Sequence, residues 1–158
     1  MRYPAWFLAA CRGPTRSGHE MPALPWSARS SLPPTYACFV TASRQALRRY
    51  RDVPAFLRHV RAVRRRLRDG DGVLGYALAA RLHDRTFWTV SAWVDPAAAN
   101  AFTNASGAPA VAPGPALAAS ISVSWSCLAE ELPVGWDEVR RRLRDAGDAR
   151  RRGAVPSR

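Results

Sequence analysis

Hydrophobic and polar positions alternate along several short segments of the chain, and this alternation predicts β-strands. The clearest case is Ser120–Cys127, where serine occupies every second position and an apolar residue or cysteine occupies each of the others. In Thr86–Val94, two sets of alternating residues each form an apolar face with a tryptophan. The sequence predicts four strands, Thr35–Thr41, Val73–Leu82, Thr86–Val94 and Ser120–Cys127, the middle two joined as a hairpin by a polar turn at His83–Arg85.

Three other segments show the spacing of amphipathic helices. The strongest begins after Asp52, runs over Val53–Arg68 and stops before a Gly-Asp-Gly turn. Asp95 followed by proline predicts the start of a short helix over Pro96–Thr103. A third helix follows Pro133, because Trp136, Val139 and Leu143 recur at helical spacing, with acids in the first turn and arginines after them.

The order strand, helix, strand, strand, helix, strand predicts an α+β fold of the ferredoxin-like split βαββαβ type. Its four-stranded antiparallel sheet carries two helices on one face, with an extra helix at the C-terminal end. Both faces of Thr86–Val94 are too apolar to remain in water, so the second face of the sheet needs a cover. In a short chain a second copy can supply that cover, and we therefore expect a homodimer.

Prolines and composition suggest three regions along the 158 residues. Residues 1–34 lack any sustained period and contain repeated prolines, which predicts an irregular arm. Within it, 1–20 are interpreted as an upstream extension, with Met21 as the natural start. The ferredoxin-like domain is expected over 35–146, and 147–158 are expected to be a disordered basic tail.

All 24 basic residues are arginine, against 12 acidic residues, for a formal charge of +12. Such an excess is compatible with a nucleic-acid-associated protein, which we keep as an alternative. However, the helix arginines occupy the solvent-facing side and no aromatic residues are interleaved among them, so nucleic acid is not the favoured partner. No apolar run approaches the roughly 20 residues of a membrane-spanning helix, so no membrane partner is expected.

The motifs that would identify common enzyme classes are missing. Cys11, Cys38 and Cys127 lie far apart and form no CxxC pair, so we expect reduced thiols in a cytoplasmic protein and no metal site. No catalytic Ser/His/Asp set, paired carboxylates, HExxH motif or glycine-rich phosphate loop occurs. Hydrolase, kinase and metalloenzyme functions therefore have no support from the sequence.

Several segments together resemble a known family from Met21 to about Leu143. They are Met21–Trp26, Asp52–Leu57, Val63–Leu67, Phe87–Trp93 and Glu131–Glu138. The chain resembles uncharacterised bacterial members of the dimeric α+β barrel superfamily, similar to antibiotic-biosynthesis monooxygenases. The resemblance implies two protomers packed sheet to sheet, each with a small pocket between its sheet and helices.

Characterised relatives oxidise aromatic substrates with molecular oxygen and without a bound metal or flavin, which implies no cofactor here. Other members of the superfamily degrade haem or bind small hydrophobic molecules. Related sequences tend to carry histidine, arginine and methionine after the second helix, where this chain has Ser106–Val111. That departure favours, as the alternative to an enzyme, a non-catalytic dimeric barrel protein.

A cofactor-free oxygenase site needs an apolar pocket, aromatic walls and polar groups that stabilise an anion. Tyr76, Trp88 and, more weakly, Trp125 are the candidate residues for binding a small aromatic or hydrophobic molecule. Arg64 is the candidate for holding an anionic oxygen because it projects within the apolar stripe of its helix, and His59 at the edge of that stripe is the candidate base. The alternative is that the aromatic residues form core and that the Arg64 stem covers core while its charge reaches solvent.

Overall fold

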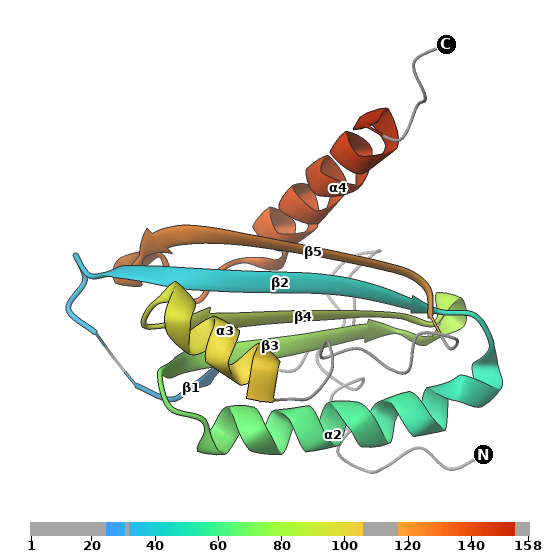
Figure 1. Cartoon of the computed structure of the whole chain (residues 1–158), viewed down its shortest axis with the longest axis horizontal. Helices are drawn as coiled ribbons and strands as arrows, with labels where there is room; N and C mark the ends of the chain where they lie inside the picture. The colour runs from blue at the N-terminus through green and yellow to red at the C-terminus, as the bar shows by residue number, and fades with distance from the viewer. Residues whose placement is uncertain (1–24, 31, 106–116, 154–158) are drawn as a thin grey trace.

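The computed structural model describes residues 25–30, 32–105 and 117–153. They form an α+β fold with a five-stranded antiparallel sheet and three α-helices (Figure 1). The strands are β1 (Ser27–Ala28), β2 (Ala37–Leu47), β3 (Val73–Arg81), β4 (Thr86–Trp93) and β5 (Leu117–Leu128). The helices are α2 (Val53–Asp69), α3 (Pro96–Ala105) and α4 (Trp136–Gly153), with 3-10 turns η1 (Tyr50–Asp52), η2 (Leu82–Asp84) and η4 (Ala129–Glu131).

The strands follow the order β1-β3-β4-β2-β5. Because β1 pairs with only two residues of β3, we call β4 and β2, which have long neighbours on both sides, the two interior strands. Every neighbouring pair is antiparallel. Residues directly opposite one another project to the same face, so Val40 shares a face with Ala92 and Trp125. The register therefore fixes which side of the sheet each side chain reaches.

Helices α2 and α3 cover one face of the sheet. Phe56 of α2 packs on Phe87 of β4 with ring centroids 4.4 Å apart. Towards the other end of α2, Leu67 joins Trp93 of β4 and Ala99 of α3 in a second buried cluster. Both apolar clusters form because the helices turn their hydrophobic stripes toward the sheet.

Helix α4 covers part of the opposite face. Val139 and Leu143 are 0% and 2% exposed and pack with the apolar residues of β2 and β4. At Gly147 the helix comes so close to β5 that an added Cβ would lie 3.2 Å from Ile121. The C-terminal end of α4 then projects beyond the sheet (Figure 1).

The structure confirms the α+β class and the antiparallel sheet but differs from the prediction at the ends of the chain. The sheet has five strands rather than four, because β1 pairs with β3 from within the segment predicted to be irregular. The disordered tail predicted from 147 is wrong as far as Gly153, since α4 continues to that residue. Ala149 and the three arginines that follow it, Arg150–Arg152, favour helix in this last stretch. Residues 1–24, 106–116 and 154–158 lie outside the described part, and with them Met21 and Ser106–Val111.

Truncation of Leu143 tests the packing of α4 on the sheet. Leu143→Ala is expected to lower the free energy of unfolding by about 2–5 kcal/mol, because it opens a cavity in a fully packed cluster. The matched control is Asp145→Ala, at an exposed position of the same helix, which is expected to change that free energy by less than about 1 kcal/mol. Urea unfolding followed by circular dichroism measures both, and equal losses would contradict the packing described here.

Candidate functional site

A row of hydroxyl groups runs along the two interior strands, on the face of the sheet that α2 and α3 cover. Thr41 Oγ1 lies 2.9 Å from Ser91 Oγ, and Ser43 Oγ lies 2.7 Å from Thr89 Oγ1. The indole Nε1 of Trp93 donates to Ser91 Oγ at 3.0 Å. These hydroxyls satisfy one another, so the row stabilises the polar part of this face rather than supplying a nucleophile.

Arg64 and Tyr76 line one cavity of about 320 Å³ on the same side of the sheet. Helix α2 places Arg64 there, half-buried, and β3 contributes Tyr76, which is 4% exposed. Three more arginines of α2 complete the described lining, Arg61, Arg65 and Arg68. These positions recur every three to four residues, so they project from one side of the helix.

The cavity is strongly positive. Its described lining contains four arginines and a tyrosine but neither a carboxylate nor a histidine. A guanidinium binds a carboxylate or phenolate through two parallel hydrogen bonds, and an aromatic ring gives a planar ligand a surface to pack on. The arrangement is therefore suited to binding an aromatic anion.

Trp88 lies on the opposite face of the sheet from Tyr76. In the register of β3 and β4, Trp88 is opposite Ala79, which is three residues from Tyr76. Because side chains alternate between faces, an odd separation places Tyr76 and Trp88 on different sides. The structure thus does not bring these two predicted pocket walls together.

Trp88 instead lines a second cavity of about 640 Å³ between the sheet and α4. The ring is 4% exposed, and the guanidinium carbon of Arg81 lies 5.5 Å from its centroid. Trp125 of β5 lies on this face too, half-buried under Arg142 with its guanidinium carbon 4.6 Å from the ring centroid. It lines neither this cavity nor the one at Arg64.

His59 is also separate from Arg64. Its ring lies near Phe56, with centroids 6.5 Å apart, and its Nε2 is buried without a hydrogen-bond partner among the described residues. The two residues are five positions apart on α2, which turns their side chains well away from each other. His59 is therefore not positioned as a base in the cavity that Arg64 lines.

The second cavity contains two arginines that sequence reasoning missed, Arg44 and Arg81. One sequence signal was available for Arg44. It continues the alternating series Cys38, Val40 and Ala42, which the structure shows to be buried on the α4 side. An arginine that follows such a series by two residues shares its face.

Cys38 and Cys127 face each other across β2 and β5. Their sulfur atoms are 3.4 Å apart, and both are free thiols. Burial of Cys127, together with its hydrogen bond to Cys38 and the charge of that group, raises the pKa of Cys127 to about 12. Cys127 is therefore held as an unreactive thiol at neutral pH.

Comparison with known proteins identifies no family. No protein-family model matches the chain, and no curated protein matches it. Among solved structures, one from Pseudomonas aeruginosa is 21% identical, with a TM-score of 0.48 over 60% of this chain and 97% of that one. A protein of unknown function from Nitrosomonas europaea is 15% identical, with a TM-score of 0.47 over 64% of this chain and 99% of that one.

A candidate monooxygenase from Lactobacillus acidophilus is 6% identical, with a TM-score of 0.44 over 66% of this chain and 51% of that one. Likenesses this distant do not transfer a function to this protein. Within the described residues, no group of His, Cys, Asp or Glu side chains is arranged to hold a metal ion. None of the described helices is long and apolar enough to cross a membrane.

The raised pKa of Cys127 predicts slow alkylation in the folded protein. At about pH 8 we expect its reaction with iodoacetamide to be about a thousandfold slower than in the unfolded chain, because the thiolate is so much rarer. Stability should fall as the pH rises from about 9 toward about 12, since the unfolded chain loses this proton first. Peptide mapping by mass spectrometry measures the labelling. A Cys127 peptide labelled equally fast in both states would contradict the assignment.

Proposed function

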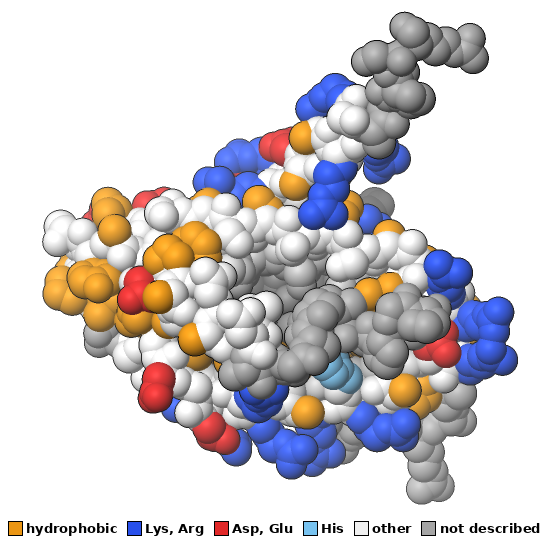
Figure 2. Space-filling model, viewed as in Figure 1, with side chains coloured by type: hydrophobic (Ala, Val, Ile, Leu, Met, Phe, Trp, Pro, Cys, Tyr) orange, Lys and Arg blue, Asp and Glu red, His pale blue; other side chains and the backbone are white. Residues whose placement is uncertain are grey.

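We propose that the protein binds a small aromatic anion, such as a hydroxybenzoate, in the cavity between α2 and β3. The observation that carries this proposal is that Arg64 and Tyr76 line one cavity of about 320 Å³ whose described lining has no carboxylate. The volume is at the lower end of ligand pockets, which suits a single substituted ring. Arginine side chains gather along α2, at the lower edge of the molecule in Figure 2, and would favour entry of an anion.

The roles of the two residues follow from their chemistry. The Arg64 guanidinium would hold the carboxylate or phenolate oxygens of the ligand, and the Tyr76 ring would pack on its aromatic face. The neighbouring Arg61 and Arg65 add positive charge without an ion-pair partner among the described residues. A negatively charged ligand would neutralise the charge of these arginines, so the cavity should bind an acid more tightly than its neutral analogue.

Oxygenation is the reaction that the family resemblance implies, and it requires more functional groups in the site than ligand binding does. An oxygenase of this type needs a group that stabilises an anion and, where the substrate must be deprotonated, a base. The described lining offers the first in Arg64 but no histidine or carboxylate for the second. Ligand binding is therefore the function that the geometry supports best.

The proposal includes a ferredoxin-like protomer. Its support is the strand order, in which β2 and β3 are joined by α2 and lie on either side of β4. The fifth strand, β1, adds to the outer edge of β3.

Assembly as a homodimer is also proposed. Tyr36 and Leu128 are 44% and 38% exposed, and hydrophobic side chains gather where β2 begins and β5 ends (Figure 2). In the described sheet β5 is an edge strand, whose backbone is open to pairing. Sedimentation equilibrium is expected to give a dimer that Leu128→Arg weakens, and a wild-type monomer at every concentration would contradict this assembly.

Removal of Arg64 tests the ligand site. Arg64→Gln is expected to weaken hydroxybenzoate binding by about tenfold or more, because a hydrogen bond to a charged group contributes roughly 1.5–3 kcal/mol. Isothermal titration calorimetry measures the change. The matched control is Arg58→Gln, which removes the same charge from an exposed position of α2 outside the cavity and should change the affinity less than about twofold.

Arg61→Gln provides a second test inside the cavity should Arg64→Gln disturb the fold, which circular dichroism would reveal. Benzamide, the neutral counterpart of benzoate, is expected to bind more weakly than benzoate. Equal binding of the acid and the amide, or equal losses in Arg64→Gln and Arg58→Gln, would count against this site.

A further inference from the structure

The cavity between α4 and the sheet is a second candidate site, separate from the one at Arg64. It has a volume of about 640 Å³ and is lined mainly by charged residues. Its described lining includes five arginines, Arg44, Arg81, Arg140, Arg144 and Arg151, but only two carboxylates, Asp137 and Asp148. The excess of positive charge suggests a negatively charged ligand.

Arg44 occupies an unusual position at the floor of this cavity. It lies on the interior strand β2, directly between Trp88 of β4 and Ile121 of β5. Its side chain is half-buried and has no ion pair or hydrogen bond within the described residues. A partly desolvated guanidinium without a counter-charge is costly, and an anion bound beside it would offset that cost.

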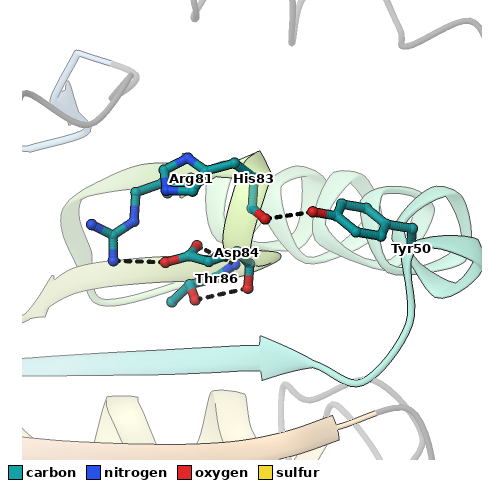
Figure 3. A network of polar contacts seen from close by, with 5 residues as sticks. All are labelled: Tyr50, Arg81, His83, Asp84 and Thr86. Carbon is teal, nitrogen blue, oxygen red and sulfur yellow. Dashed lines mark hydrogen bonds and ion pairs between the residues drawn. The ribbon is translucent and has the colours of Figure 1, made fainter.

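Arg81 reaches the same floor from β3, and a network at the β3–β4 turn holds it there (Figure 3). Its Nη2 lies 2.7 Å from Asp84 Oδ2, and Thr86 N–H donates to Asp84 Oδ1 at 3.2 Å. Burial alone would raise the pKa of Asp84, but the hydrogen bonds from Arg81 and Thr86 and the charge of Arg81 lower it. Asp84 therefore stays ionised and keeps Arg81 in position.

One donor of Arg81 is left unused by this network. Its Nε is buried and has no hydrogen-bond partner among the described residues. The guanidinium lies over the ring of Trp88, so its position is fixed by both the ion pair and the aromatic face. A buried donor without an acceptor is uncommon. The Arg81 side chain as a whole is 42% exposed, so the outer part of its guanidinium is open to a ligand in the cavity.

Helix α4 supplies the wall above this floor. Arg140, Arg144 and Arg151 recur at helical spacing beside the buried stripe of the helix. Asp137 lies 2.5 Å from Arg140, and Asp148 lies 3.9 Å from Arg151, which partly neutralises those two arginines. Arg144 has no carboxylate partner within the described residues, so it remains available to a ligand together with Arg44.

We propose that this cavity binds a small phosphorylated molecule through Arg44, Arg81 and Arg144. A phosphate monoester carries about −1.5 to −2 charge at neutral pH, which matches the two arginines without a carboxylate partner, Arg44 and Arg144, better than a single carboxylate does. Arginine also binds phosphate oxygens through two parallel hydrogen bonds. The cavity is larger than a lone phosphate requires, so the natural ligand carries a further phosphate or an organic group.

Pyrophosphate is the probe for this site, titrated into the full chain by calorimetry. Arg44→Gln and Arg144→Gln are each expected to weaken its binding by about tenfold or more. Arg152→Gln, an exposed arginine of the last turn of α4 that does not line the cavity, should leave the affinity within about twofold. Arg144→Gln changes an exposed helix position, so it keeps the test valid if Arg44→Gln fails to fold.

Two crossed measurements separate this site from the proposed hydroxybenzoate site. Arg64→Gln should retain pyrophosphate binding, and Arg144→Gln should retain hydroxybenzoate binding. Absence of pyrophosphate binding, or an equal loss in Arg144→Gln and Arg152→Gln, would overturn the phosphate site while leaving the aromatic site untouched. Duplex DNA that competes with pyrophosphate at equal phosphate concentration would also overturn it, since the ligand would then be nucleic acid.

Discussion

Burial of the two interior strands on both faces is the constraint on which this structure depends. Val40 and Ala92 are 0% exposed on one side, and the hydroxyl row from Thr41 to Ser91 lies on the other. Neither face of β2 or β4 can be left open, so α2 and α3 must cover one side and α4 must pack on the other. Each candidate site residue of the sheet therefore faces either the layer of α2 and α3 or the layer of α4.

Much of this layered fold follows from sequence periodicity. The alternation in Ser120–Cys127 predicts a strand, and the stripe in Val53–Arg68 predicts the helix that the structure contains as α2. Strand β1 has only two residues, which is too short to show a period, and it forms because β3 offers it an edge. The length of α4 could not be predicted from the sequence pattern either. A glycine such as Gly147 usually indicates a helix end, but here it is buried against Ile121 inside the helix.

The candidate sites were harder to predict because they depend on register and on distant contacts. The position of Arg64 within a helical stripe is local, and the structure places it in a cavity with Tyr76. Whether Tyr76 and Trp88 share a pocket depends on the parity of strand pairing, which a hairpin of uncertain turn length does not reveal. Arg81 could not be identified as a site residue from the sequence for a different reason. Its position in the cavity is set by its contacts with Asp84 and Trp88.

The 24 arginines of the chain therefore do not act as one basic surface. Four of those on α2 line the cavity at Tyr76, whereas Arg44 and Arg81 join three of those on α4 on the other side of the sheet. The central claim is that the two faces of one sheet carry two anion sites of different chemistry.

A crystal structure with iodinated hydroxybenzoate and pyrophosphate tests this claim most directly. We expect the anomalous signal of iodine beside Arg64 and Tyr76 and phosphate density beside Arg44 and Arg144. Iodine in the α4 cavity, or both ligands in one cavity, would contradict the account.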